Sequence, residues 1–310
     1  AMLVPNVVSA QNNYPDHAIT LVVPYGPGGE TDIFARAISN EVSKELGQPI
    51  VILNRAGATG IVGSDFVAKS TPDGYTLLFG TAATQALNLS VYKKLPYRPL
   101  KDFSPVAFVG SVPLVLYANS SMPAKPREFI DELKAHPNKY FSGSAGLSTS
   151  YLGIELFKNA AKVSVTDVPY KGTAEAMAGL LGNQVQMLGG SLGAGKALVR
   201  GGKLYAVAVM SKEPLMAAPE IPTFKQSVGL DLEVGTWNVV MAPKGTPEPI
   251  VSRLNAAFNT ALGRPAVVER LAALGITAIS DSTPDSTAKM ISSEIKKWAY
   301  AAKLAGVKPQ

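Results

Sequence analysis

The 310-residue chain contains no cysteine and only two histidines, His17 and His136. The absence of cysteine excludes disulfide bridges, thiolate metal sites and cysteine nucleophiles. Two histidines are too few for a three-histidine metal site, and they leave the chain short of the commonest general acid–base residue. Charged residues make up 17% of the chain, and the net charge of +6 is a mild excess rather than a basic patch. The composition therefore argues against most metal-dependent and thiol-dependent enzymes.

The chain also lacks a hydrophobic run of the roughly 18 residues that a membrane-spanning helix needs. Its most apolar stretch, residues 108–118, is interrupted by Gly110 and Pro113. Near the N-terminus, Val8-Ser9-Ala10 is typical of the small-residue site at which a signal peptide is cleaved. We therefore expect residues 1–13 to be a tag and signal-peptide remnant or a flexible tail, and the protein to be exported.

Strands and helices alternate along the first eighty residues. Short apolar runs predict strands at residues 19–23, 50–53 and 76–79, and helical spacing predicts helices at 33–46 and 60–68. Such a β-α-β-α-β order implies a parallel sheet with right-handed crossovers.

A second α/β unit follows. Its predicted strands cover residues 140–142, 165–169, 185–188 and 205–209, and its predicted helices cover 129–133, 152–161, 173–181 and 195–199. Two long apolar segments, 106–117 and 234–241, connect the units, and we expect the helices after the second segment to cover the first sheet. The chain is therefore predicted to form two doubly wound α/β domains with a hinge and an interdomain cleft. The first domain would contain residues 14–110 plus 236–310, and the second residues 111–235.

Two glycine-rich motifs resemble enzyme sites but lack an essential residue. Residues 189–193 have the G-x-S-x-G form of a nucleophile elbow around Ser191, yet no histidine follows His136. Residues 190–197 nearly match a phosphate-binding loop, yet Ala197 stands where Ser or Thr must hold Mg²⁺.

A third motif, Gly57–Gly63, resembles the glycine fingerprint of dinucleotide-binding dehydrogenases, because it follows a predicted strand and opens a helix. Asn54 and Arg55 end that strand, where such a site usually stays apolar. The alternative function is thus a nucleotide-dependent oxidoreductase that uses this loop. We expect no cofactor, no metal and no nucleic-acid partner, because acidic ligand clusters and interleaved basic and aromatic residues are missing.

Five loops rich in small residues each lie between a predicted strand and a predicted helix, at residues 25–31, 81–84, 142–150, 170–173 and 190–194. In an open parallel sheet such loops emerge at the carboxyl edge, where ligands bind. Small residues leave backbone N–H groups exposed, and each following helix directs its positive dipole end the same way. Two such sets facing each other across an interdomain cleft would hold a small dianion, which predicts a binding protein rather than an enzyme.

Short motifs occur in a fixed order from Tyr14 to the C-terminus. They are Pro24-Tyr-Gly-Pro-Gly-Gly-Glu-Thr-Asp32, Asn54-Arg-Ala-Gly-Ala-Thr-Gly60, Pro72-Asp-Gly-Tyr-Thr-Leu-Leu78, Leu95-Pro-Tyr97 with Asp102-Phe103, Ser142-Gly-Ser-Ala-Gly146, Val168-Pro-Tyr-Lys-Gly172, and Ala217 and Pro219 with Ile221-Pro-Thr223. In this combination the chain resembles the Bug-type solute receptors of tripartite tricarboxylate transporters. The resemblance implies a monomeric periplasmic receptor of the venus-flytrap type (periplasmic-binding-protein type II). It would close on a small carboxylate, deliver it to the transporter's membrane subunits and catalyse nothing.

The resemblance also implies which residues bind the ligand. On the first lobe they would be Tyr25, Gly28, Gly29, Thr31, Thr81, Ala82 and Thr84. On the second lobe they would be Ser144, Ala145, Ser148, Thr149 and Ser191, with Tyr170, Lys171 and Gly172 at the cleft wall. Trp237 and Asn238 would lie near the hinge, where Trp237 could stack on a flat ligand.

One departure from the family pattern bears on the ligand. The family often carries an acidic residue where this chain has Met187-Leu-Gly-Gly-Ser-Leu192. Without it, an amino-acid ligand loses a partner for its ammonium group. We therefore expect a mono- or dicarboxylate without an amino group, and an aromatic one in particular, because the glycines leave space for a ring. Glu30 must point away from such a ligand to avoid repelling it, whereas Asp32 suits the first turn of a helix.

Overall fold

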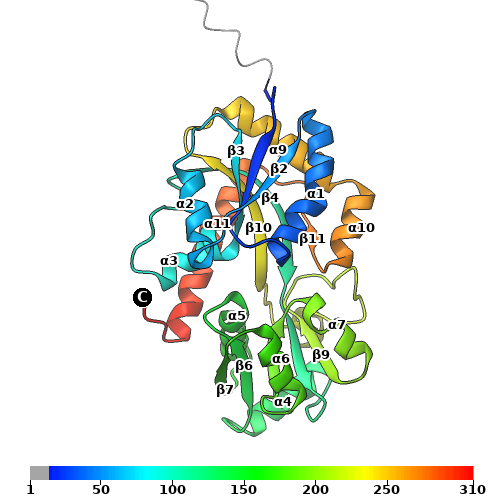
Figure 1. Ribbon diagram of the computed structural model, residues 1–310. Coiled ribbons are helices and arrows are strands. Elements are labelled where there is room, and N and C mark those ends of the chain that lie inside the picture. Colours follow the sequence, from blue (N-terminus) through cyan, green and yellow to red (C-terminus); the bar gives the residue numbers. More distant parts are fainter. Residues whose placement is uncertain (1–13, 310) are drawn as a thin grey trace, which may run out of the picture.

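Two β-sheets organise the part of the chain that this computed structural model describes, residues 14–309 (Figure 1). The six-stranded sheet has the strand order β11-β4-β10-β3-β1-β2, and the five-stranded sheet has the order β7-β6-β8-β5-β9. We call residues 14–113 and 235–309, around the first sheet, the first lobe, and residues 114–234 the second lobe. The N-terminal remnant predicted at residues 1–13 lies outside the described residues.

The first lobe contains a mixed sheet. Its strands are β1 (Ile19–Val23), β2 (Ile50–Asn54), β3 (Thr76–Thr81), β4 (Phe103–Pro113), β10 (Gly235–Pro243) and β11 (Thr277–Ala278). Its helices are α1 (Glu30–Leu46), the 3₁₀ turn η1 (Ala58–Gly60), α2 (Ile61–Ala68), the π-turn η2 (Ala83–Leu87), α3 (Asn88–Val91), α9 (Glu248–Leu262), α10 (Pro265–Ala273) and α11 (Pro284–Leu304). Strands β1, β2 and β3 are parallel, as predicted. Strand β10 returns from the second lobe and pairs antiparallel with both β3 and β4.

The second lobe repeats this plan on a smaller scale. Its strands are β5 (Val115–Asn119), β6 (Phe141–Ala145), β7 (Thr166–Tyr170), β8 (Met187–Gly190) and β9 (Leu204–Val209). Its helices are α4 (Pro126–Ala135), α5 (Thr149–Ala161), α6 (Thr173–Leu181), α7 (Leu192–Arg200) and α8 (Phe224–Val228). Strand β6 is parallel to β7 and β8, whereas β5 is antiparallel to β8 and β9.

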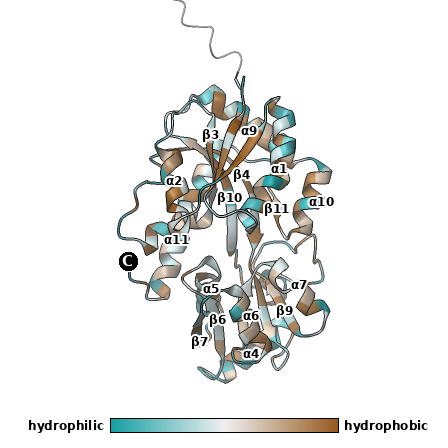
Figure 2. Cartoon of the chain, in the orientation of Figure 1, coloured by the Kyte–Doolittle hydropathy of each residue, from teal (hydrophilic) through white to brown (hydrophobic). Residues whose placement is uncertain are grey.

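Local signals set many of these boundaries. Gly47 ends α1 in the left-handed conformation, with its N–H donating to the carbonyl of Ser43. Thr283 starts α11 with a capping box. Several predicted boundaries were wrong. Strand β6 continues to Ala145, where it pairs with β7, and α7 begins at Leu192 rather than Gly195. Helices α1, α4 and α5 also begin three residues before the predicted positions, and β8 begins and ends two residues after them. Figure 2 shows the strongest apolar colour on the strands of the first lobe, between helices with mixed faces.

The chain passes between the lobes at Leu114, between β4 and β5, and again at Val234, before β10. These crossings are bonded side by side, because Leu114 N–H donates to the carbonyl of Val234 at 2.8 Å. Met210, which follows β9, is bonded to both crossings. Its N–H donates to the carbonyl of Leu114 at 2.8 Å, and its carbonyl accepts from the N–H of Val234 at 3.0 Å. The two lobes are thus connected by a narrow, hydrogen-bonded hinge.

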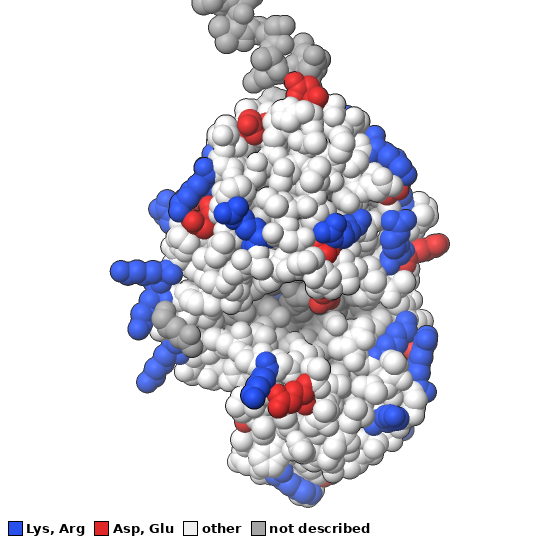
Figure 3. Space-filling view, in the orientation of Figure 1, with Lys and Arg blue, Asp and Glu red and all other residues white. Residues whose placement is uncertain are grey.

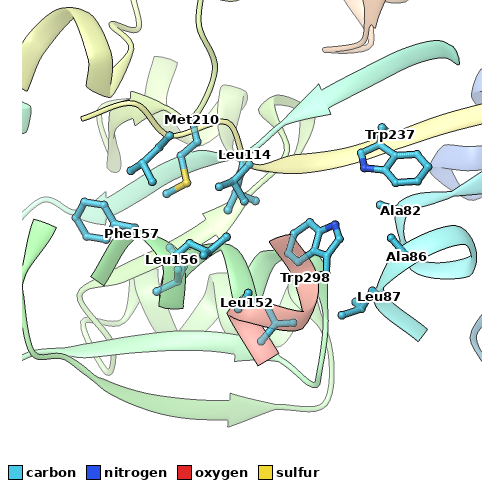
Figure 4. Packing of buried hydrophobic residues seen from close by; sticks show 14 of the residues in the cluster. Ala82, Ala86, Leu87, Leu114, Leu152, Leu156, Phe157, Met210, Trp237 and Trp298 are labelled. Atoms are coloured by element: carbon cyan, nitrogen blue, oxygen red, sulfur yellow. The ribbon is translucent and has the colours of Figure 1, made fainter. Parts of the chain in front are cut away.

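The C-terminal helix α11 departs from expectation. It packs against β4 and η2 of the first lobe, as predicted, but also against α5 of the second. Trp298 belongs to a buried apolar cluster that includes Leu152 and Leu156 of α5 (Figure 4). Asn159 of α5 donates to the Tyr300 hydroxyl at 3.2 Å. The helix therefore covers both lobes, and one apolar core continues from one lobe into the other.

Candidate functional site

A hollow opens between the lobes, and its walls carry few charged side chains (Figure 3). The carboxyl ends of parallel strands from both sheets are directed at it (Figure 1). Helix α1 begins on its first-lobe side, and α5, α6 and α7 begin on its second-lobe side. Because the free N–H groups and the positive dipole ends of these helices face the same space, the hollow suits an anion.

Four predicted residues meet in the first lobe, of which Thr84 is fully buried and Thr81 and Asn238 are each 4% exposed. The Tyr25 hydroxyl lies 3.0 Å from Thr81 Oγ1, and the Thr81 N–H donates to Thr84 Oγ1 at 2.9 Å. Asn238 on β10 is paired with Thr81 across the sheet. Burial raises the pKa of Tyr25, so its hydroxyl stays protonated and can donate. The side chain of Ala82 is buried in the core, so only its backbone could reach a ligand.

The β1–α1 loop is held by Asp32, which lies in the first turn of α1 as predicted. Its carboxylate accepts hydrogen bonds from Gly28 N–H at 2.9 Å, from Arg36 Nε at 2.9 Å and from Asn54 Nδ2 at 2.8 Å. The Arg36 bond, aided by the other two, lowers the pKa of Asp32 to about 2. Helix α1 has Gly29 at its N-cap and therefore no side-chain cap. The N–H groups of its first turn, including that of Thr31, therefore have no competing cap acceptor.

Glu30 is the first residue of α1 and lies beside these N–H groups. Its solvent-accessible area classes Glu30 as exposed. The protein atoms around its carboxylate nevertheless displace enough water to raise its pKa. Both observations fit a side chain on a concave wall. There the carboxylate is open to water on one side and surrounded by protein on the others. Its expected orientation away from a ligand stays a prediction.

Sequence reasoning missed the β2–α2 loop as a part of this wall. Gly60 has a positive φ of 84°, and a Cβ there would lie 2.5 Å from Thr84 Cγ2 and 3.2 Å from the Tyr25 hydroxyl. The neighbouring Thr59 carbonyl accepts from Asn88 Nδ2 at 3.2 Å. The signal was present, because this loop is glycine-rich and joins a strand to a helix like the other five. The sequence assigns these glycines to the alternative nucleotide site and to a family motif, but not to the ligand wall.

On the second lobe, the β6–α5 loop supplies backbone more than free hydroxyls. Ser144 Oγ donates to Asp167 Oδ2 at 2.8 Å, so this hydroxyl is already engaged, and burial raises the pKa of Asp167. Ser148 caps α5 by accepting from Tyr151 N–H at 3.3 Å. Ala145 ends β6 and Thr149 begins α5, which places both at the cleft edge.

The β7–α6 and β8–α7 turns complete this edge. Gly172 is the N-cap of α6, and Lys171 N–H donates to Glu175 Oε2 at 2.9 Å. Ser191 is the N-cap of α7, and its carbonyl accepts from the Tyr117 hydroxyl at 2.9 Å.

The side chain of Tyr170 does not follow its backbone to the cleft. A Cβ on Gly179, two turns into α6, would lie 2.3 Å from the Tyr170 hydroxyl. That hydroxyl donates to Gln184 Oε1 at 3.4 Å, beyond the C-terminal end of α6. The ring therefore points back along α6, away from the helix N-terminus.

The structure buries the side chain of Trp237 in an apolar cluster that also contains Ala82 (Figure 4). Its side chain is 4% exposed, and its indole N–H donates to Glu294 Oε2 of α11 at 2.8 Å. This environment is hinge core, which a sequence cannot distinguish from a ligand wall.

Side chains of the core also occupy the space beside the glycines of β8, where the sequence suggested room for an aromatic ligand. A Cβ on Gly189 would lie 2.9 Å from Leu114 Cδ2, and one on Gly190 would lie 3.4 Å from the Tyr117 ring. Core side chains therefore fill the room that these glycines were expected to leave for an aromatic ligand, and that expectation is wrong.

Within residues 14–309, no three acidic, histidine or cysteine side chains gather closely enough to bind a metal ion. Over the same residues, no helix combines the length and the apolar character needed to cross a bilayer.

Comparison with known proteins agrees with this geometry. Residues 34–306 match the family model described as the tripartite tricarboxylate transporter family receptor. Protein BugT of Bordetella pertussis is 38% identical over 300 residues, covering 96% of this chain and 92% of BugT. The solved periplasmic binding protein BugD is 33% identical, with a TM-score of 0.75 over 96% of this chain and 100% of BugD. Rpa4515 of R. palustris, solved with adipate, is 34% identical, with a TM-score of 0.79 over 96% of this chain and 100% of its own. The two-lobed α/β fold predicted from sequence is confirmed.

Proposed function

Because this chain belongs to the family of tripartite tricarboxylate transporter receptors, we propose that it is a solute-binding receptor that closes on one small carboxylate. The convergence of helix N-termini from both lobes on one hollow carries this proposal. A carboxylate that accepts two or three backbone N–H bonds is well satisfied without an arginine. Ser144 is the cleft hydroxyl that lies beside a carboxylate, that of Asp167, and neither is followed by a histidine that would complete a catalytic triad. With the family relation, this supports binding without catalysis as the function we propose.

The ligand would lie between the β1–α1 loop and the β6–α5 loop. Backbone N–H groups at the start of α1 and α5 would hold its carboxylate, and the Tyr25 hydroxyl would donate to it. The β2–α2 loop at Gly60 would support Tyr25 from behind. Closure would be a hinge motion about Leu114 and Val234, favoured by a ligand that contacts both lobes. In this motion the first lobe, residues 14–113 plus 235–309, would rotate against the second lobe, residues 114–234. These bounds differ by a few residues from the domains predicted from sequence, because β4 and β10 stay paired up to Pro113 and Gly235.

For the ligand itself, we propose a mono- or dicarboxylate without an amino group, aliphatic or aromatic. The segment Met187–Leu192 offers no carboxylate for an ammonium group. The adipate bound to Rpa4515 is an aliphatic dicarboxylate without an amine, which supports the same class. We further propose that the receptor acts as a monomer in the periplasm, with its signal peptide removed, and delivers its ligand to the membrane subunits of a tripartite tricarboxylate transporter.

The test is a thermal-shift panel on protein that has been unfolded and refolded to remove any carried ligand. The panel contains amino acids, aliphatic dicarboxylates, tricarboxylates, benzoates, phthalates and NAD(P). A ligand at ~100 times its Kd adds about 2.7 kcal/mol to the free energy of unfolding, which is readily seen. We expect a shift with one class of amine-free carboxylate. Stabilisation by amino acids would overturn the proposed ligand class, and stabilisation by NAD(P) alone would overturn the receptor in favour of the oxidoreductase.

A further inference from the structure

Both tryptophans of the chain donate to a single carboxylate at the hinge. Trp237 on β10 and Trp298 on α11 place their indole nitrogens 2.8 and 3.0 Å from Glu294 Oε2. The three residues are 4%, 0% and 9% exposed. A buried carboxylate that loses a donor pays a large desolvation penalty, so the three groups hold each other in place.

A lysine ties the same carboxylate to the second lobe. The Lys297 ammonium pairs with Glu294 Oε1 and donates to the carbonyl of Glu233 at 2.9 Å. Glu233 stands next to the crossing at Val234. One turn of α11 is therefore bonded both to β10 and to the segment that arrives from the second lobe. We call Trp237, Glu294, Lys297 and Trp298 the hinge latch.

The latch lies where a hinge motion must be accommodated. Helix α11 packs on β4 and η2 on one side and on α5 on the other, so closing the lobes moves α5 relative to α11. Beside the latch is a cavity of about 360 Å³ whose walls come from both lobes, including Phe108, Met210, Val234 and Met290. Because packed cores resist gradual deformation, free volume at this place lets the segments shift.

We propose that Glu294 is a positioning residue that sets the angle between the lobes by holding α11 against the crossing strands. The proposal rests on the hinge motion of the proposed function, but its test needs no ligand. It can therefore fail or succeed independently of carboxylate binding.

The test uses the absence of native cysteine. Asn40→Cys on α1 and Arg200→Cys on α7 place one spin label on each lobe, at exposed positions. Pulsed electron resonance then measures the distribution of inter-lobe distances in the ligand-free protein. Trp237→Phe and Trp298→Phe each keep an aromatic ring and remove one indole donor. We expect each of them to shift the mean distance and to broaden the distribution.

The matched control is Tyr75→Phe, which removes a 2.7 Å bond to the Asp16 carboxylate far from the hinge and should leave the distribution unchanged. Glu294→Gln keeps an oxygen for the indoles but loses the Lys297 ion pair, and we expect a smaller shift of the same sign. If the three hinge variants lower the midpoint of unfolding while their inter-lobe distances match the unsubstituted chain, the latch is only structural and the proposal is wrong.

Discussion

Asp32 stabilises the β1–α1 loop through three hydrogen bonds made by a nearly fully buried carboxylate. We expect Asp32→Asn to lower the free energy of unfolding by about 1–3 kcal/mol, because the amide cannot satisfy all three donors. The loop carries the N-terminus of α1, so carboxylate affinity should fall as well. Urea denaturation and ligand titration measure the two effects.

The Asp32 effect has a defined pH dependence. Its folded-state pKa of about 2 lies below the ordinary value of 3.8, so its stabilisation is complete above pH 3.8 and is lost as pH falls through the folded-state pKa. The difference in the free energy of unfolding between Asp32→Asn and the unsubstituted chain should therefore shrink as pH falls from 3.8 toward 2. Asp285→Asn is the control, because Asp285 also lies in a first helical turn but is exposed. If Asp32→Asn and Asp285→Asn lowered the free energy of unfolding by the same amount, Asp32 would have no special role in stability.

Glu30 places a negative charge at the helix end that is proposed to hold the ligand carboxylate. Because we expect the side chain of Glu30 to point away from the ligand, Glu30→Gln should change carboxylate affinity by less than about twofold. Two like charges ~4 Å apart in water repel by about 1 kcal/mol, so a Glu30 carboxylate that faced the ligand would lower the affinity roughly fivefold. Desolvation raises the pKa of Glu30, so a facing carboxylate would also make binding strengthen as pH falls from 7 toward that pKa. Calorimetry at several pH values compares the unsubstituted chain with Glu30→Gln and with the control Glu128→Gln in the first turn of α4. Tighter binding by Glu30→Gln, together with a lost pH slope, would show that Glu30 faces the ligand and would overturn the expectation.

Among the elements, the β2–α2 loop offers a sharp test because Gly60 has no room for a side chain. We expect Gly60→Ala to push Thr84 and Tyr25 out of place and to weaken carboxylate binding more than tenfold. Gly202→Ala is the matched control, since Gly202 also has a positive φ, of 67°, but nothing lies within 4 Å of its Cβ position. Both variants carry left-handed strain of about 1–2 kcal/mol. Binding that survives Gly60→Ala would exclude this loop from the site.

The elements themselves were largely predictable, because each is encoded locally. The apolar run Ile19–Val23 and the helix that Gly47 ends needed only pattern and cap signals. The turns that expose backbone N–H groups followed from the same strand-to-helix order. The antiparallel insertion of β10 could not be predicted, because it depends on where the chain returns after the whole second lobe.

The directions of side chains at the candidate site could not be predicted from the sequence either. Sequence placed Trp237 and Tyr170 near the cleft, and their backbones do lie on the elements expected. The indole of Trp237 nevertheless faces Glu294, and the ring of Tyr170 lies along α6. These directions are set by partners far away in sequence, which no local pattern encodes.

At the scale of the whole molecule, the two lobes share one apolar core. A single buried cluster contains Val22 and Leu78 of the first lobe as well as Leu152 and Phe157 of the second. Figure 4 shows Trp298 between Leu152 of the second lobe and Ala86 of the first. Two other clusters each lie within one lobe. Because neither lobe can lose its packing without exposing part of the shared core, we expect both lobes to unfold in one transition.

Urea denaturation tests this coupling. Tryptophan fluorescence reports only the hinge, where both indoles lie, whereas far-UV circular dichroism reports the helices of both lobes. We expect the two curves to coincide. Leu254→Ala removes a buried side chain from the first-lobe cluster, and Leu180→Ala removes one from the second-lobe cluster. Each should cost about 2–5 kcal/mol and move the whole transition. If each variant moves only part of a two-step curve, the lobes unfold separately and the continuity of the core carries no coupling. A single transition would mean that the hinge can bend on ligand binding while the packing beneath it keeps the lobes one thermodynamic unit.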